Sequence, residues 1–373
     1  MRAMSLCHQA ALAALAVLAL TGCVAAQPTA PSAAAVGERI RQRYDAALMT
    51  LPANRQRHYA QRLYRITGDD RYLPLNRAYA GRLLASLGDE INALADPGYP
   101  LRRGRQLVED YGVNTPRQRR RKRLLGRWPE VAYARRLAFQ LTQARYHGLL
   151  NAIDLPGYGR ALTYLASVGF EPFLTDPAAI DTYAAQLANL AYYLHGLGVA
   201  DLRQQTAAAF RAHYPPHAVA SLDETAYRNR LYGMTHFVIA ASDYYQCPVD
   251  AEDFSWALDA FESELPRILA TKADIFAEVG ISFLLAGRSD SPALDAIRQA
   301  LVEAYDPEAG MIPGEDGDTD LAGGEHRNVL AIMLLGWPER LHPGPLLSAA
   351  ASAAPPGAAT TGPWVCTTRG LVE

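Results

Sequence analysis

The sequence predicts an all-α fold built from stacked antiparallel helix pairs. Apolar residues recur at three- and four-residue steps, for example at Leu83, Leu84, Leu87 and Ile91, and this spacing places them on one face of a helix. Alternating runs of β-branched residues, which are typical of strands, are nearly absent. Short links between amphipathic helices favour antiparallel pairs, and stacked pairs bury each other's faces in solenoids or closed toroids.

The first residues are typical of an export signal. Arg2 precedes an apolar stretch from about Ala10 to Leu20, which is too short to span a bilayer of roughly 30 Å. The order Leu-Thr-Gly-Cys that ends at Cys23 resembles the lipobox of bacterial lipoproteins. That resemblance implies acylation of Cys23 and a lipid anchor, and Val24 after it favours the outer membrane, facing the periplasm. The alternative is ordinary secretion, with cleavage after Ala26.

The chain is predicted to hold one folded domain between two flexible segments. Residues 1–22 are the signal peptide, and residues 23–36 form a tether of small residues. Residues 346–373, rich in Ala, Pro, Ser, Gly and Thr, are expected to be disordered. A single α-helical domain therefore occupies residues 37–345.

Charge and cysteine content narrow the partners and the compartment. The formal net charge of −2 excludes a basic field over the whole chain, so nucleic acid is not an expected partner. After cleavage of the leader and acylation of Cys23, Cys247 and Cys366 remain. These two cysteines can pair in an oxidising compartment, but the sequence leaves the pairing open.

The links between helices share one chemistry. In residues 63–73, 194–202 and 284–294, a glycine is followed by Asp or Ser before the next periodic segment. Glycine ends a helix in a left-handed conformation, and Asp or Ser caps the next one. We therefore expect tight turns at all three places.

Two resemblances follow from short motifs. The order Tyr-x-x-Thr-Gly-Asp-x-x-Tyr-Leu at 64–73 resembles the inter-helix turns of the α/α-toroid glycosidases and polysaccharide lyases, and residues 305–313 resemble the loop that crosses the mouth of such a toroid. Residues 232–236, 277–281 and 324–328 are similar to motifs of an uncharacterised domain family of bacterial secreted proteins. The second resemblance implies a shared fold and transfers no activity.

A helix predicted from about 226 to 245 carries a polar stripe. Tyr232, His236 and Asp243 fall on one line of an otherwise apolar helix. Such a stripe suits a concave site, in which Tyr232 and His236 bind substrate and Asp243 acts as base or nucleophile. The alternative is a hydrogen-bonded core histidine with Asp243 at a fraying helix end.

A second helix, over residues 271–285, is apolar nearly all round and is expected to be buried. Asp274 and Glu278 lie four residues apart on one of its faces. Burial is expected to raise the pKa of Glu278, as a general acid near neutral pH requires, and Glu278 is the first catalytic candidate. The alternative for Glu278 is a buried salt bridge to an arginine. The spacing Thr271-x-x-Asp274 favours a capping box for Asp274.

The acidic stretch before the last predicted helix places Asp316, Asp318 and Asp320 at alternate positions. This imitates the first half of an EF-hand loop, but the sixth position, which needs Gly, holds Leu321. The twelfth position, which needs Glu, holds Arg327. We therefore expect no EF-hand and no metal site, and we favour a solvated acidic turn over an irregular calcium site.

The tetrad Glu325-His326-Arg327-Asn328 follows two glycines at the start of a predicted buried helix. Glycines let the backbone approach a ligand closely, and Arg327 offers bidentate binding to an anion. We expect His326, Arg327 and Asn328 to bind substrate and Glu325 to serve as the second catalytic carboxylate. The alternative is that Glu325 stabilises the helix start, where the dipole favours a carboxylate.

The most basic segment of the chain is residues 117–123, with six cations in seven positions. For this run we favour a solvated helix face over a contact with anionic lipids of the envelope.

The sequence therefore predicts a lipid-anchored envelope protein with an α/α-toroid-like domain and a carbohydrate-active role, as a glycan hydrolase or lyase that uses buried carboxylates. The rival is a non-catalytic scaffold that binds a glycan or a protein partner on its concave face. No cofactor is expected, because the chain contains no glycine-rich phosphate loop, no Gly-x-Ser-x-Gly, no His-Glu-x-x-His and no Cys-x-x-Cys.

Overall fold

The computed structural model describes residues 31–348, and this part of the chain is all-α. It contains no strand, and its β pairing is limited to an isolated bridge between Asp306 and Met311. Successive helices pack against one another in pairs. The predicted all-α fold of paired helices is therefore confirmed.

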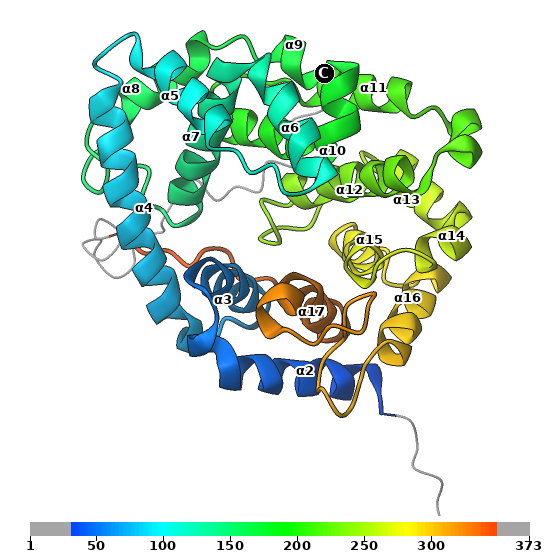
Figure 1. The fold of residues 1–373 in the computed structure, drawn as a ribbon. Coiled ribbons are helices and arrows are strands. Elements are labelled where there is room, and N and C mark those ends of the chain that lie inside the picture. The colour runs from blue at the N-terminus through cyan, green and yellow to red at the C-terminus, as the bar shows by residue number, and fades with distance from the viewer. Residues whose placement is uncertain (1–30, 349–373) are drawn as a thin grey trace, which may run out of the picture. The chain divides into compact units, whose positions relative to one another are not determined.

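Six helices of the described part form a closed circuit of neighbours (Figure 1). In this circuit α3 contacts α17, α17 contacts α15, α15 contacts α12, α12 contacts α10, and α10 contacts α7. Side chains close the circuit, because the amide of Gln61 on α3 donates to Oε1 of Gln143 on α7 at 3.1 Å. The six helices are α3 (Ala53–Thr67), α7 (Pro129–Tyr146), α10 (Pro177–Gly196), α12 (Glu224–Ala241), α15 (Ala273–Leu285) and α17 (Leu321–Leu335).

The remaining helices pack against members of this circuit or against one another (Figure 1). They are α2 (Ala33–Ala47), α4 (Leu73–Ala93), α5 (Tyr99–Glu109), α6 (Pro116–Gly126), α8 (Tyr158–Ser167), α9 (Glu171–Leu174), α11 (Arg203–His213), α13 (Ser255–Ser263), α14 (Leu265–Leu269) and α16 (Pro292–Glu303). Three short 3₁₀ segments complete the described chain: η1 (Leu48–Thr50), η2 (Asp70–Tyr72) and η3 (Pro216–Ser221). Five of the circuit helices, α3, α7, α10, α15 and α17, therefore also contact helices outside the circuit.

The predicted turn glycines are present at the three links. Gly68, Gly198 and Gly287 adopt φ values of +66°, +66° and +69°, the left-handed region that glycine enters without a Cβ clash. After the first of these glycines, the Asp69 carboxylate accepts from the backbone N–H of Arg71 and caps η2. Ser291 likewise caps α16, as expected, whereas the predicted cap at Asp201 is wrong, because α11 begins after Leu202 without a side-chain cap.

The folded part begins earlier and ends later than predicted. Helix α2 starts at Ala33, so the last residues of the predicted tether are helical, and Val36 is fully buried. At the other end, the backbone N–H of Leu347 donates to the carbonyl of His147 at 2.9 Å. Hydrophobic burial and a backbone hydrogen bond hold these ends, although their small-residue composition suggested flexible segments.

The predictions that concern the leader fall on Cys23 and its neighbours, which lie outside the described residues. No helix of residues 31–348 is long and apolar enough to span a bilayer. Cys247 is disulfide-bonded, whereas Cys366, the partner considered for it, also lies outside the described residues.

Candidate functional site

Glu278 lies where three helices of the circuit meet. It is on α15 with 1% of its surface exposed, and the hydroxyl of Thr235 on α12 donates to its Oε2 at 2.8 Å. Its Oε1 lies 3.7 Å from Nε2 of His236 and 3.6 Å from Nε2 of His326 on α17. The structure thus brings together three residues that the sequence places on separate helices.

The pKa of Glu278 is lowered, which is opposite to the predicted rise. Burial alone raises this pKa, but the charge of His236 and the contact with His326 outweigh it. Burial lowers the pKa of His236, against the attraction of Glu278. Glu278 is therefore an ionised carboxylate at neutral pH, and its pKa does not suit a general acid.

Glu325 is the second buried carboxylate, and it lies in the second turn of α17. Asp320 caps this helix, because its carboxylate accepts from the backbone N–H groups of Ala322 and Gly323. Glu325 is fully buried, and its Oε1 lies 2.7 Å from Nδ1 of His58 on α3. The alternative in which Glu325 stabilises the helix start is therefore wrong.

Glu325 and His58 have opposite tendencies to take up a proton. Burial raises the pKa of Glu325 to about 7, although the charges of Arg62 and other cations oppose this rise. Burial, followed by the charge of Arg62, lowers the pKa of His58 well below its ordinary value. Oε2 of Glu325 has no hydrogen-bond partner among residues 31–348, and Arg55 approaches it only to 3.7 Å. Near pH 7 the carboxyl of Glu325 is therefore protonated in about half of the molecules, and it faces a neutral imidazole.

The histidines, unlike the glutamates, keep exposed surface. The side chains of His58, His236 and His326 are 17%, 18% and 33% exposed, whereas those of Glu278 and Glu325 are 1% and 0% exposed. The rings of His58 and His326 also lie 5.2 Å apart, centroid to centroid. The site therefore presents imidazoles to a ligand and keeps the carboxylates behind them.

A strained segment follows α12. Asp243, Tyr244 and Tyr245 have φ values of 50°, 60° and 68°, and a residue other than glycine costs about 1–3 kcal/mol in this region. Nη2 of Arg145 lies 2.5 Å from Oδ1 of Asp243, and Nη1 of Arg65 donates to the carbonyl of Tyr244 at 2.8 Å. These contacts hold the backbone in its strained conformation. Such strain is often found at functional sites.

The strained segment turns the ring of Tyr244 toward the histidines. The centroid of its ring lies 6.3 Å from that of His236, and its hydroxyl accepts a hydrogen bond from Tyr193 at 3.0 Å. On the other side of His236, Nδ1 lies 3.0 Å from Oδ1 of Asn189. His236 is thus held between Asn189 and Glu278.

A cavity of about 630 Å³ has His326 in its lining, and we call it the histidine cavity. Its lining includes His326, Arg327, Tyr232 and Asp274. The hydroxyl of Tyr232 donates to Oδ2 of Asp274 at 2.6 Å. The histidine cavity therefore collects predicted residues from α12, α15 and α17.

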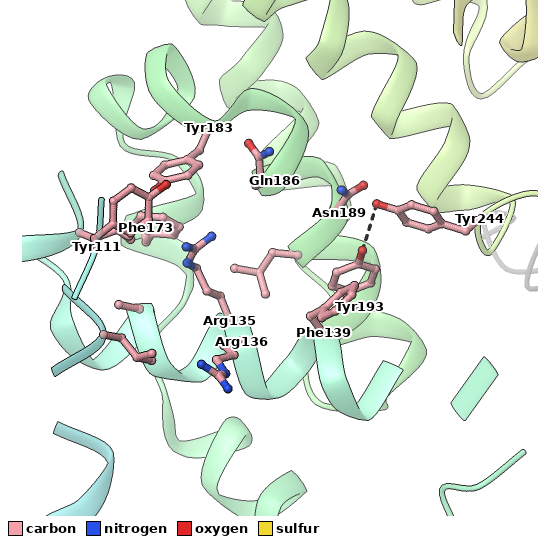
Figure 2. A pocket seen from close by; sticks show the side chains of 14 residues that line it. Tyr111, Arg135, Arg136, Phe139, Phe173, Tyr183, Gln186, Asn189, Tyr193 and Tyr244 are labelled. Atoms are coloured by element: carbon pink, nitrogen blue, oxygen red, sulfur yellow. Dashed lines mark hydrogen bonds between the residues drawn. The ribbon is translucent and has the colours of Figure 1, made fainter. Parts of the chain in front are cut away.

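A second cavity, of about 480 Å³, lies among α5, α6, α7 and α10, and we call it the aromatic cavity. Figure 2 shows Arg135 pointing toward Tyr111, Phe173 and Tyr183 at one end of this cavity. At the other end are Asn189, Tyr193 and Tyr244, which border the environment of His236 (Figure 2). The aromatic cavity therefore adjoins His236, one of the two histidines that lie next to Glu278.

Two predicted residues have other partners than expected. The cap of α15 falls at Lys272 without a side-chain hydrogen bond, and the hydroxyl of Thr271 donates to the carbonyl of Ile268. The capping box predicted for Asp274 is therefore wrong, because Asp274 accepts from Tyr232 instead.

Asp243 does not share a helix with His236, because α12 ends at Ala241. Its carboxylate is bound to Arg145, so the line of side chains predicted from helical spacing ends before it. The structure therefore shows no contact between Asp243 and Glu278 in the described chain.

Asn328 is fully buried and engaged with the backbone. Its Oδ1 accepts from the N–H of Ile312 at 2.8 Å, and its Nδ2 donates to the carbonyls of Ile312 and Gly324, each at 3.0 Å. Arg327 also donates to the carbonyl of Ile312, at 2.9 Å, and it remains in the lining of the histidine cavity. Asn328 thus ties a loop to α17, and its predicted substrate contact is not seen.

The acidic loop before α17 binds its own backbone. Oδ1 of Asp316 accepts from the N–H of Asp318 at 3.2 Å, and Oδ1 of Asp318 accepts from that of Asp320 at 2.9 Å. Asp320 then caps α17. Within residues 31–348 no group of three or more His, Cys, Asp or Glu is arranged to hold a metal ion.

Sequence reasoning missed His58 and Asn189. Arg55, His58 and Arg62 follow a three- and four-residue spacing on α3, as Gln186, Asn189 and Tyr193 do on α10. Each is a polar stripe on a helix of the circuit, which is the same signal that singled out Tyr232 and His236. Counting polar stripes on every helix would have found both residues.

The comparisons with known proteins place the chain in a family without assigning it an activity. Neither a curated protein nor a solved structure matches it. A family model described as a domain of unknown function (DUF3541) matches residues 33–356. This range begins at the first residue of α2 and includes every helix described above. The chain belongs to this family of the domain of unknown function DUF3541.

Proposed function

We propose that the chain is a glycan-cleaving enzyme, a hydrolase or a lyase, in which buried glutamates control proton transfer by histidines. The observation that carries the proposal is the opposite displacement of two carboxyl pKa values: that of Glu278 is lowered and that of Glu325 is raised to about 7. A pair of titratable groups with separated pKa values is the usual basis for assigning an acid and a base.

The histidines are the groups that meet the substrate in this proposal. Glycosidases that use two carboxylates directly need both of them at the scissile bond, whereas Glu278 and Glu325 are buried. A carboxylate behind an imidazole fixes the orientation of the ring, as in other carboxylate–histidine pairs. Two proton transfers are needed at the scissile bond. One would be made by His58 together with Glu325, and the other by His236 and His326 together with Glu278.

The cavities beside the histidines suit a sugar chain. The aromatic cavity presents Tyr111, Tyr183, Phe173 and Tyr244, whose rings combine apolar faces with, in tyrosine, a hydroxyl for hydrogen bonding. The histidine cavity adds Tyr232 and cationic side chains. Both have the concave form and the few convergent polar groups that ligand sites usually show.

We further propose that the protein acts in the cell envelope, anchored through lipid on Cys23 and facing the periplasm. The signal-like start and the lipobox order support this location. The disulfide at Cys247 also supports it, because disulfides persist in oxidising compartments. The acyl chains make the membrane one partner and leave the domain free to meet an envelope glycan.

A glycan screen tests the activity. The purified full-length chain, in detergent, is incubated with neutral glucans, chitin oligomers, peptidoglycan strands and uronate polymers, and new reducing ends are counted. We expect reducing ends from at least one glycan, and a loss of roughly 10²–10⁴-fold in rate for Glu325→Gln and for His58→Gln. Glu308→Gln, at an exposed acid remote from both cavities, is the matched control and should retain the wild-type rate.

Two outcomes would overturn the proposal. If no glycan yields reducing ends, the protein is not a glycan-cleaving enzyme of these classes. If one is cleaved but Glu325→Gln and His58→Gln keep the full rate, the catalytic groups lie elsewhere. Binding of a glycan without cleavage would favour the scaffold role, which stacked helices often fill.

A further inference from the structure

The basic run at residues 117–123 lies on α6, and its cations differ in exposure. Arg121, one turn before the buried Leu124 and Leu125, is half-buried, whereas Arg117, one turn earlier, is exposed at the start of the helix. The side chains of Arg119 and Lys122 donate to the carbonyls of Val113, in the loop before α6, and of Glu109, at the end of α5. Four of the six cations are exposed, as expected for a solvated face, and the exceptions are the half-buried Arg121 and Lys122.

Helix α6 is held firmly in this orientation. Thr115 and Gln118 form a reciprocal capping box, with hydrogen bonds of 3.0 and 3.1 Å, and Pro116 occupies the first helical position. The helix packs against α5, α7 and α10. The backbone that carries Arg117 and Arg121 is thus held in place before any ligand arrives, which lowers the ordering cost of binding.

Arg117 lies between the two cavities. It lines the histidine cavity together with Arg120, and it is within electrostatic reach of Tyr111 and Tyr183, which line the aromatic cavity. Burial and the charge of Arg121 lower the pKa of the Arg117 guanidinium. Two neighbouring cations in a partly buried place repel each other, and an anion between them would relieve that repulsion.

Several guanidinium groups here have unused hydrogen-bond donors. Nε and Nη2 of Arg121 and Nε of Arg135 are buried and have no hydrogen-bond partner among residues 31–348. Both guanidinium groups lie over the ring of Tyr183, at 4.7 and 5.0 Å from its centroid. A buried donor without a partner costs roughly 1–3 kcal/mol, so a ligand that supplies acceptors would gain from meeting these groups.

We propose that Arg117 and Arg121 of α6, together with Arg135 of α7, bind the carboxylates of an acidic, uronate-containing glycan chain. Arginine pairs with carboxylates in bidentate fashion. Arg117 and Arg121 are separated by about 6 Å along the helix axis, so a polymer that carries a charge on each unit can engage both. The ring of Tyr111, which is half-buried and lines the aromatic cavity, offers a face on which the sugar can stack.

This inference rests on the proposed function, because it names the substrate class for the same site. The bound chain would run along α6 from the aromatic cavity, past Asn189 and Tyr244, toward the histidines. Its anionic groups would then face the arginines, and its glycosidic bond would face the imidazoles.

The test uses oligogalacturonate as the probe and the full-length chain in detergent. Affinity is measured by calorimetry for wild type, for the double variant Arg117→Gln/Arg121→Gln, and for Arg119→Gln/Arg123→Gln. The second double variant removes the same charge from the same helix at residues that line neither cavity, so it controls for net charge. Arg135→Lys, which keeps the charge but loses the planar fork, is a further variant for the case in which a double variant fails to fold.

We expect the affinity for oligogalacturonate to fall at least tenfold in the Arg117/Arg121 variant and by less than twofold in the Arg119/Arg123 variant. Arg135→Lys should weaken binding several-fold at unchanged melting temperature. Equal losses in both double variants would overturn the proposal, because they would reveal only unspecific charge attraction. Tighter binding of a neutral glucan, of polyphosphate or of single-stranded nucleic acid would overturn the uronate class.

The failure of this inference and that of the proposed function give different results. If oligogalacturonate binds through the α6 arginines but no glycan is cleaved, the ligand class stands and the enzymatic role is lost. If a neutral glycan is cleaved in a way that depends on His58 and Glu325, and oligogalacturonate does not bind, the enzymatic role stands and the ligand class is lost.

Discussion

Oε1 of Glu325 lies 2.7 Å from Nδ1 of His58, and this contact joins α17 to α3. The two residues are separated by more than two hundred positions in the sequence; Glu325 is fully buried, and His58 is largely buried. Burial favours the neutral carboxyl of Glu325 and the neutral imidazole of His58. The two groups therefore form a hydrogen bond between neutral partners instead of an ion pair. The contact therefore makes the protonation of the site sensitive to pH near neutrality.

The first prediction concerns stability against pH. The pKa of Glu325 is about 7 in the folded chain against an ordinary value of 4.5. Between pH 4.5 and pH 7, the carboxyl of Glu325 is therefore protonated in the folded state and ionised in the unfolded state. The contribution of Glu325 to the free energy of unfolding is therefore fully present below pH 4.5 and is lost as the pH rises to 7. It amounts to about 3 kcal/mol. We expect denaturant unfolding at several pH values to show a smaller decline across this window for Glu325→Gln than for wild type.

The control is Glu308→Gln, which changes an exposed acid. This variant should follow the wild-type curve. A Glu325→Gln curve that runs parallel to wild type from pH 4.5 to 7 would mean that the carboxyl of Glu325 titrates normally.

The second prediction isolates the hydrogen bond to Glu278. Thr235 is fully buried and donates to Oε2 of Glu278 at 2.8 Å. Thr235→Val keeps the shape but leaves a buried carboxylate oxygen without this donor, which should cost about 1–3 kcal/mol of unfolding free energy. Thr142→Val is the matched control, because the hydroxyl of Thr142 is buried without a hydrogen-bond partner within residues 31–348. Equal effects of the two substitutions in urea denaturation would contradict the assigned bond.

The third prediction concerns the packing of α5 on α7. A methyl group on Gly104 would lie 1.9 Å from the carbonyl oxygen of Pro129, so Gly104→Ala must push the two helices apart. We expect a loss of at least about 1–3 kcal/mol, because the obstacle is backbone. Gly88→Ala, inside α4 with no atom within 4 Å of the new methyl group, should gain roughly 0.5–1 kcal/mol. A neutral Gly104→Ala in thermal unfolding would show that this helix contact is looser than described.

The sequence was sufficient for the fold class because helical periodicity and turn glycines are local signals. Gly68 and the residues after it have a conformation that their own chemistry determines. The ends of the domain were less predictable: Ala33 and Leu347 belong to small-residue segments, and only contacts with distant parts of the chain hold them. Composition does not record such contacts.

The candidate site was predictable in some of its members but not in its electrostatics. His236, Glu278 and His326 could be named from helical stripes and glycine motifs, and they meet in the structure. The direction of the pKa of Glu278 could not be foreseen, because it depends on neighbours from two other helices. For the same reason the sequence suggested Glu278 as the acid, whereas the raised pKa belongs to Glu325.

The fourth prediction concerns the strained segment that presents Tyr244. Asp243 has a φ of 50°, and its carboxylate is bound to Arg145. Asparagine tolerates the left-handed region nearly as well as aspartate, so Asp243→Asn removes the charge without adding backbone strain. Breaking a largely buried pair leaves Arg145 without its anion, and we expect a loss of about 2–4 kcal/mol.

A double-mutant cycle with Arg145→Gln separates the ion pair from other effects of each change. If the pair holds the segment, Asp243→Asn and Arg145→Gln should be coupled by about 1–3 kcal/mol in urea denaturation. Because the pair fixes the position of Tyr244, both single variants should also weaken binding of oligogalacturonate, while the exposed-acid variant Glu308→Gln should not. Additive losses would mean that Arg145 and Asp243 act independently and that other contacts, such as that of Arg65 with the carbonyl of Tyr244, hold the strained backbone.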